Sequence, residues 1–418
     1  MNQPADLCPA PSADPSPPAL TPALTVFFAA TTGVIIINLF AAQPLTGPIS
    51  AALHLPAGLT GLVAMLPQLG YAAGLVLLVP LIDLLENRRL IVTTLVICAA
   101  TLAIPAVTHS GALFLGAAFV AGATSSVIQM LVPLAASMAP DAQRGRAVGN
   151  VMSGLMLGIL LSRPIASLIA DAAGWRAFYA TAAAANLLIA VVLAAQLPAR
   201  APAVSTRYGA LLRSLWTLAT TERVLQRYAL SAALVMASFS AFWTAIGLRL
   251  AQAPFHFSLH GIALFALAGA TGAIVTPLAG RAGDRGWDRR VARGAHLAML
   301  AALTVMGVAG AGWGGFDATA HPVPAVALLV VAAATLDAGV VADQTLGRRA
   351  VNLLNPAARG RLNGLFVGIF FIGGALGAML AGVAWAWAGW GAVCAVGLTF
   401  AAAALVLGAV APHADASR

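Results

Sequence analysis

Long apolar stretches, separated by short polar segments, occupy nearly the whole chain. A helix needs about 20 mostly apolar residues to cross the hydrocarbon core of a bilayer, because each residue adds about 1.5 Å. Within lipid, only helices and closed barrels satisfy their own backbone hydrogen bonds, and barrel strands are alternating segments of about ten residues. Continuous apolar runs of this length therefore predict an all-α integral membrane protein.

Twelve such spans can be placed along the sequence, six in each half. The predicted spans of the first half are residues 24–47, 58–82, 89–108, 110–138, 146–170 and 175–197. Those of the second half are residues 227–250, 258–282, 291–314, 322–345, 359–385 and 387–411. We therefore expect two six-helix bundles, over residues 24–197 and 227–411, joined by a cytoplasmic linker at 198–226 and flanked by a disordered tail at 1–23 and a short tail at 412–418.

The chain is strongly basic, with 22 arginines, no lysine, 13 acidic residues and a formal net charge of +9. In a soluble protein this excess would suggest a nucleic-acid partner. Here, however, most arginines fall in loops on one side of the predicted bundle, and the positive-inside rule places such loops in the cytoplasm. The basicity therefore indicates topology: both termini cytoplasmic, in a bacterial cytoplasmic (inner) membrane, with no nucleic acid bound.

Several kinds of chemistry are excluded by what the sequence lacks. Without lysine there is neither a Walker A lysine nor a Schiff-base lysine. Cys8, Cys98 and Cys394 are scattered without metal or disulfide spacing, and Ser258 between His256 and His260 is typical of a helix cap. No carboxylate dyad or nucleophile with its base is visible in any span. We expect no metal site, no cofactor and no enzymatic activity.

Two sequence signatures recur in both halves. Asp83, Arg88 and Arg89 match Asp284, Arg289 and Arg290 at an offset of 201 residues, and "RGRAVG" at 144–149 matches "RGRLNG" at 359–364. Repeats with the same orientation predict two halves related by an axis along the membrane normal, enclosing one site near the bilayer midplane. Rocking of one half against the other would open this site to each side in turn.

These motifs resemble those of the major facilitator superfamily of secondary transporters. The likeness rests on "GRAGDRGWDRR" at 280–290, the more divergent "DLLENRR" at 83–89, "NLFAAQPL" at 38–45 and "FSAFW" at 239–243. They are similar to the branch with arabinose-efflux-like and drug:proton antiporter permeases. The resemblance implies twelve spans in two pseudo-symmetric halves, with a cavity lined largely by spans one, four, seven and ten and, to a lesser extent, by two, five, eight and eleven.

The resemblance also implies that the repeated charges form a cytoplasmic gate, which holds the halves together when the site faces outward. The alternative is that these arginines only enforce topology. The residues predicted for the gate are Asp83, Arg88, Arg89, Arg144, Arg146, Asp284, Arg285, Arg289, Arg290, Arg359 and Arg361.

Polar groups inside predicted spans are candidates for the site, because they are expensive to place in lipid. Asp337, the only carboxylate deep in a span, is the candidate for proton coupling, although a structural ion pair is an equal alternative. Arg163 replaces a glycine of a glycine-rich motif that resembling permeases carry in span five, as Ile159 replaces its proline. Either Arg163 faces the cavity and indicates an anionic substrate, or it snorkels to the surface. Ala118 stands where the family often has an arginine linked to proton movement.

The residues predicted to contact substrate are Asn38, Gln43, Gln129, Arg163, Ser240, Trp243 and Asp337, with Asp337 and Arg163 also predicted to couple protons. Interhelical hydrogen bonding is the alternative for any of the uncharged ones. Glycines spaced by four residues occur in spans two, five and eleven, as Gly70 and Gly74, Gly154 and Gly158, and Gly373 and Gly377. We expect close helix packing there, at the moving interface between the halves.

These features predict a monomeric, proton-coupled secondary transporter that exports a small organic solute by alternating access. An importer or uniporter of the same fold is the alternative within this class. A membrane sensor that binds without translocating is the alternative outside it, and the gate signatures in both halves argue against that function. The partners expected are a small-molecule substrate, possibly an anion, together with protons and the lipid bilayer.

Overall fold

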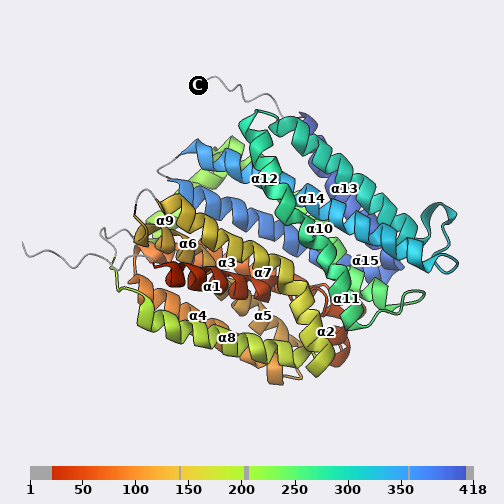
Figure 1. Ribbon diagram of the computed structural model, residues 1–418, viewed down its shortest axis with the longest axis horizontal. Helices are drawn as coiled ribbons and strands as arrows, with labels where there is room; N and C mark the ends of the chain where they lie inside the picture. Colours follow the sequence, from red (N-terminus) through yellow and green to blue (C-terminus); the bar gives the residue numbers. More distant parts are fainter. Residues whose placement is uncertain (1–20, 141–142, 202–206, 356–357, 411–418) are drawn as a thin grey trace, which may run out of the picture.

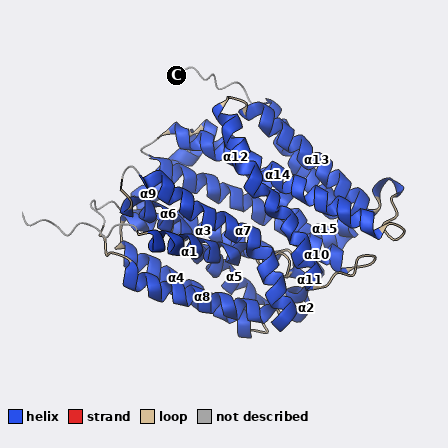
Figure 2. Cartoon of the chain, viewed as in Figure 1, coloured by secondary structure: helices blue, strands red, loops and turns tan. Residues whose placement is uncertain are grey.

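The computed structural model describes residues 21–140, 143–201, 207–355 and 358–410. Most of these residues are helical, with loops between the helices, and no strand is present among them (Figure 2). The tails predicted at 1–23 and 412–418 therefore lie almost wholly outside the described residues. The all-helical class predicted from the apolar runs is confirmed.

The helices of residues 21–201 lie together in one half of the molecule, drawn in red to yellow-green in Figure 1. Their bounds are α1 Pro22–Phe40, α2 Thr46–Ala52, η1 Ala57–Leu59, α3 Leu62–Leu77, η2 Val79–Asp83, α4 Asn87–Val107, α5 Gly111–Ser125, α6 Ile128–Met138, α7 Arg144–Ala173 and α8 Trp175–Gln196. We call this the first half.

The helices from α10 onward form the other half, drawn in green to blue, and α9 lies in the linker (Figure 1). Their bounds are α9 Tyr208–Thr221, α10 Arg223–Ala251, α11 Leu259–Ala266, η4 Leu267–Ala270, α12 Thr271–Asp284, α13 Asp288–Ala311, η5 Trp313–Gly315, α14 Pro322–Leu354 and α15 Arg359–Val410. We call α10 to α15 the second half.

Eleven helical segments of the described residues are long and apolar enough to cross a membrane. The last, α15, has 52 residues and would measure about 78 Å as one straight helix, more than twice the hydrocarbon thickness. It is interrupted by non-helical backbone at Ala388 and Gly389, where Gly389 has a φ of +66°. Two segments joined at this turn are consistent with twelve crossings.

The bounds of most predicted spans agree with the helices to within a few residues, because polar caps and glycines mark the ends. The Glu86 carboxylate accepts hydrogen bonds from the backbone N–H groups of Arg88 and Arg89 at 2.7 and 3.1 Å, and so starts α4. Ser258 caps α11 as predicted, accepting from the Gly261 N–H at 3.3 Å. The first span differs: α1 ends at Phe40, and a turn separates it from α2.

The predicted linker also contains a helix that the sequence analysis did not anticipate. Within residues 198–226, α9 contacts η2 and α15 (Figure 1). We call this end of the molecule, where α15 begins, the arginine-rich end. The Tyr208 hydroxyl donates to the Leu77 carbonyl oxygen at 2.8 Å, and Leu215 is buried. The linker is therefore packed on the bundle through part of its length.

The glycine pairs do bring helices close together, but the interface predicted for them is wrong. A Cβ on Gly154 would lie 2.1 Å from the carbonyl oxygen of Ala29 in α1, and one on Gly158 would lie 2.3 Å from that of Gly33. Gly70 and Gly74 likewise contact α5, and Gly373 and Gly377 contact α10. Each contact lies inside one half, so these glycines hold a half together and do not form the surface between the halves.

The halves meet closely at the end opposite the arginines, which we call the opposite end. A Cβ on Gly61, just before α3, would lie 2.2 Å from the Ala378 carbonyl oxygen of α15. One on Gly382 would lie 2.4 Å from the Gly61 nitrogen. Nearby, a Cβ on Gly47 of α2 would lie 2.9 Å from Leu248 of α10. Backbone contact this close leaves no space for a solute, so this end is closed.

Candidate functional site

A cavity of about 110 Å³ lies between the two halves. Its walls come from α1, α3, α6 and α7 on one side and from α10, η4, α12, α14 and α15 on the other. Residues on both sides include Tyr71, Gln129, Arg163, Asp337, Gln344 and Arg348, with Phe40, Phe239, Phe370 and Phe371 as the aromatic lining. Spans one, two, four, five, seven, eight, ten and eleven thus contribute, as the resemblance implied.

Arg163 of α7 faces this cavity and is only 2% exposed. Its Nε donates to Oε1 of Gln43 at 2.8 Å, and its guanidinium carbon lies 4.3 Å from the ring centre of Trp243. The rings of Phe239 and Phe40 are the next nearest, at 4.9 and 5.3 Å. Aromatic faces stabilise a desolvated cation, so the charge is held in place without a snorkelling path to the surface.

One donor of Arg163 has no protein acceptor. Its Nη2 is buried and lacks a hydrogen-bond partner within the part of the chain that the structure describes, as does Nε2 of Gln43. A buried donor without a partner costs about 1–3 kcal/mol, and more when the group is charged. An acceptor brought into the cavity would remove this penalty.

Asp337 of α14 lies on the other side of Trp243. The indole Nε1 donates to its Oδ1 at 2.9 Å, and a Cβ on Gly269 would lie only 2.6 Å from its Oδ2. The carboxyl group is 4% exposed and feels the charge of Arg163, although the two are not a direct ion pair. Trp243 therefore joins Asp337, the one acid among the described residues that line the cavity, to a buried cation.

The other residues predicted to contact substrate lie in different places. Gln129 lines the cavity, and its Nε2 donates to the Tyr71 hydroxyl at 3.1 Å. Ser240 instead donates to Oε1 of Gln68 at 3.1 Å, which links α10 to α3 across the halves. The Asn38 side chain points to Sγ of Cys98 in α4, at 3.9 Å from its Nδ2. Among the described residues that line the cavity, the predicted contacts Gln129, Arg163 and Asp337 are present, whereas Asn38, Gln43, Ser240 and Trp243 are not.

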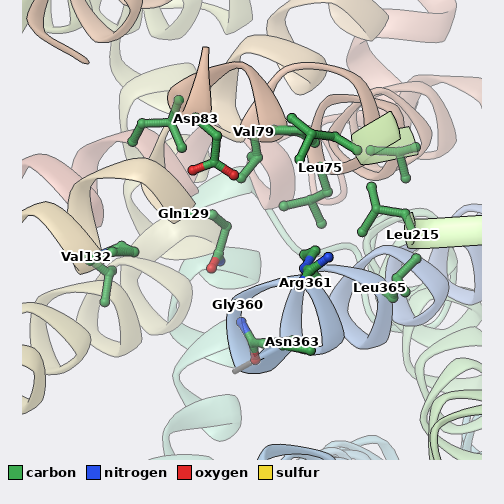
Figure 3. A pocket seen from close by; sticks show the side chains of 17 residues that line it. Leu75, Val79, Asp83, Gln129, Val132, Leu215, Gly360, Arg361, Asn363 and Leu365 are labelled. Carbon is green, nitrogen blue, oxygen red and sulfur yellow. The ribbon is translucent and has the colours of Figure 1, made fainter. Parts of the chain in front are cut away.

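A larger pocket of about 640 Å³ adjoins the cavity toward the arginine-rich end, and Gln129 lines both. In Figure 3, Asp83 and Gln129 extend into this pocket from one wall, and Arg361 of α15 faces them from the other. Leu211 and Leu215 of α9 complete the lining. We call this pocket the vestibule, because it shares Gln129 with the cavity and lies on the side away from the closed end.

The predicted gate residues all lie at the arginine-rich end. Most of the contacts that they form are within their own half or with the linker helix α9. Asp284 forms an ion pair with Arg349 at 3.2 Å, and Arg361 donates to Ser214 of α9. Arg285 lies 5.6 Å from the Trp287 ring, and Arg359 donates to the Asn352 carbonyl oxygen at 3.2 Å. Asp83 is the last residue of η2, and the remaining members are found at helix starts: Arg88 and Arg89 in α4, Arg144 and Arg146 in α7, Arg289 and Arg290 in α13.

Two groups of residues escaped the sequence analysis. Arg348 lines the cavity but was assigned to a loop, because the predicted span stopped at residue 345 whereas α14 continues to Leu354. A buried network in the second half joins His296 of α13 to Asp343 at 2.9 Å, and Ser231 of α10 donates to the same carboxylate at 3.0 Å. The sequence offered a signal for Arg348, which follows Asp337 by eleven residues, or about three helical turns, and so lies on the same helix face. It offered no such signal for the network of His296, Asp343 and Ser231.

Replacing Ser231 with alanine is expected to lower the free energy of unfolding by about 0.6–1.7 kcal/mol, the usual range for a hydrogen bond between membrane helices. Denaturant unfolding of the purified protein measures the change. Ser153→Ala is the control, since the exposed Ser153 hydroxyl bonds only to the Gly149 carbonyl oxygen of its own helix. Equal stability of the two variants would mean that the network adds nothing to the folded state.

Comparisons with known proteins agree with this architecture. Residues 23–341 match the family described as Major Facilitator Superfamily. The uncharacterized transporter YgaY of Escherichia coli O157:H7 is 36% identical over 383 residues, which cover 91% of this chain and 94% of that protein. SCO4007 of Streptomyces coelicolor, also named as a transporter, is 35% identical over 381 residues, covering 90% and 84%. The solved structure of the nucleoside transporter NupG has a TM-score of 0.68 at 16% identity, covering 92% and 97%, and shares the fold.

Proposed function

The chain belongs to the Major Facilitator Superfamily, and we propose that this multi-pass membrane transporter carries a small organic anion together with a proton, by alternating access. The working unit is a monomer, because the two halves of one chain enclose the cavity. Rocking of the halves would alternately open the vestibule and the opposite end.

The observation that carries this proposal is the unpartnered Nη2 of Arg163 at the wall of a cavity between the halves. A carboxylate or similar anion is the acceptor that a guanidinium binds most strongly, through charge-assisted hydrogen bonds. The aromatic side chains around Arg163 suit an apolar body attached to the anionic group. These features together favour an organic anion over a cation or a neutral polar solute.

Proton coupling is proposed at Asp337, the one acid lining the cavity among the described residues. While this carboxyl group is ionised, its negative charge offsets Arg163 and opposes a second anion nearby. Protonation removes that opposition, so anion binding and protonation strengthen each other. An inward proton gradient would then drive uptake. Export, which the sequence resemblance favoured, is the second candidate. It requires the anion and the proton to occupy the site alternately, so that one leaves the cell as the other enters.

We place the arginine-rich end in the cytoplasm, because basic loops are retained on that side. In this orientation the vestibule opens to the cytoplasm. The gate role of Asp83, Arg361 and the other repeated charges belongs to the alternative state, in which the vestibule closes. The positions of Asp83 and Arg361 support this gate role, since the two residues face one another across the vestibule and carry opposite charges.

Transport by the purified protein in liposomes, using organic anions that stabilise it against thermal unfolding, tests the proposal. Arg163→Gln is expected to weaken anion binding roughly 10- to 150-fold, the equivalent of about 1.5–3 kcal/mol for a hydrogen bond to a charged group. Arg176→Gln is the matched control, because Arg176 also lies 4.3 Å from a tryptophan ring but outside the cavity lining.

Three outcomes separate the candidates. Accumulation inside liposomes that are alkaline inside supports anion–proton uptake. Accumulation that instead requires an acidic interior supports exchange of the anion for protons, and with it export. Transport that is insensitive both to the gradient and to Arg163→Gln would contradict the proposed site.

A further inference from the structure

A second arginine, Arg348, reaches the same cavity from α14. Asp337, Gln344 and Arg348 are seven and four residues apart, which places them on one face of a helix, and all three line the cavity. Arg348 follows Asp337 by about three turns, or about 16 Å along the axis, toward the arginine-rich end. The cavity therefore has a cation near each end: Arg163 beside Asp337, and Arg348 toward the vestibule.

In the described part of the chain, no carboxylate forms an ion pair with Arg348, and the Tyr71 hydroxyl is the group that interacts with it. Its Nε is buried and has no hydrogen-bond partner among the described residues. Tyr71 interacts electrostatically with it, and the Tyr71 oxygen already accepts from Gln129. The Tyr71 hydroxyl proton therefore remains free to be donated. Asp337, about three turns away on the same helix, is the one acid in the described lining.

The space between the two arginines is largely apolar. Phe40, Phe370 and Phe371 line it, with Phe371 stacked edge-on against Tyr71 at 4.7 Å between ring centres. The buried guanidinium of Arg163 and the partly buried side chain of Arg348, each with a buried N–H that has no partner among the described residues, thus line the same largely apolar chamber. Asp337, which shares Trp243 with Arg163, lies about 16 Å from Arg348 along α14, so we expect one small anionic group to reach only one of the two arginines.

We propose that Arg348, with Tyr71, forms a second anion-binding subsite, so that the transported solute is a dianion whose two acidic groups are joined by a short apolar segment. This inference rests on the proposed function and specifies its substrate class. The charges support it: with Asp337 protonated, Arg163 and Arg348 give the cavity two positive charges, which a dianion neutralises. A monoanion would leave one cation of the cavity lining uncompensated.

Binding of two matched series to the full-length protein in nanodiscs tests the subsite. The probes are unbranched dicarboxylates of four to eight carbons and the monocarboxylates of equal length, titrated by calorimetry at a pH where Asp337 is protonated. The wild type is expected to bind the best dicarboxylate about tenfold or more tightly than its monocarboxylate partner, since one added charged hydrogen bond contributes about 1.5–3 kcal/mol. The preferred chain length reports the spacing of the subsites.

Arg348→Gln is expected to abolish the preference for dicarboxylates while leaving monocarboxylate affinity within about twofold, because Arg163 still binds one group. Arg348→Lys should restore part of the preference. Arg349→Gln is the neighbouring control, since Arg349 pairs with Asp284 outside the cavity lining. Thermal unfolding of each variant confirms folding before affinities are compared.

The outcomes distinguish this inference from the proposed function. Equal affinity for the two series, with both dependent on Arg163, would overturn the second subsite and leave the anion transporter standing. A dicarboxylate preference that survives Arg348→Gln but not Arg349→Gln would also overturn it. If neither series binds and no other organic anion stabilises the protein, both proposals fail.

Discussion

Replacing Gly61 with valine is expected to reduce transport roughly 5- to 150-fold, because overpacking of a close contact typically costs about 1–3 kcal/mol. The added side chain would meet the Ala378 carbonyl oxygen across the closed end, where a Cβ alone would already lie at 2.2 Å. Backbone atoms cannot rotate away as a flexible side chain can. The halves must separate at this end, so the state described here is penalised and the state open at the opposite end is favoured.

Spin labels measure this shift directly. Labels at Ala51 after the start of α2 and at Gln252 just beyond α10 lie on different halves at the opposite end, and their separation should increase in Gly61→Val. Gly58→Val is the control, since nothing lies within 4 Å of a Cβ at Gly58. Wild-type transport by Gly61→Val, with unchanged label distances, would show that closure at Gly61 is not needed for the transport cycle.

Asp337→Asn is expected to abolish gradient-driven accumulation while preserving anion exchange. Asparagine is neutral at every pH, and its Oδ1 can still accept the hydrogen bond from Trp243. In the wild type, anion affinity should rise by up to about tenfold for each unit that the pH falls, as long as the unliganded carboxyl group is ionised, and then level off. In the variant, affinity should stay at the tight limit at all pH values.

The second buried acid of α14 provides the control for this experiment. Asp343→Asn also removes a carboxylate, but one that bonds to His296 and Ser231 inside the second half and lies outside the cavity lining. It should retain the pH dependence of anion binding. If instead Asp343→Asn loses the dependence and Asp337→Asn keeps it, the proton site belongs to the His296–Asp343 pair.

Much of the architecture could be predicted from the sequence, because hydropathy reports the length of a helix in lipid. Asp337 and Arg163 stood out for the same reason: a charge within an apolar run is costly unless something surrounds it. What hydropathy cannot show is which neighbour a residue faces. The spacing of Gly154 and Gly158 correctly predicted a close helix contact, but it contained no information that the partner was α1 in the same half.

Arg348 was missed for a related reason. Its charge, with Arg349 beside it, ended the apolar run and so ended the predicted span, although the helix continues nine residues beyond position 345 to Leu354. Once a helix extends past the hydrocarbon core, polar residues on its inner face can still border a cavity. Similarly, the bond from Arg163 to Gln43 joins residues 120 positions apart, which one sequence cannot reveal without a three-dimensional fold.

The glycine contacts inside each half also bear on how such a protein can diversify. A backbone seam that admits no side-chain atom, as between α1 and α7 or α10 and α15, restricts mutation strongly. The chamber walls are less restricted, since many of their side chains border empty space, although Gly269 and Gly272 in the lining already contact side chains closely. New solute preferences can therefore evolve by exchanging wall residues, while the close helix contacts within each half are retained.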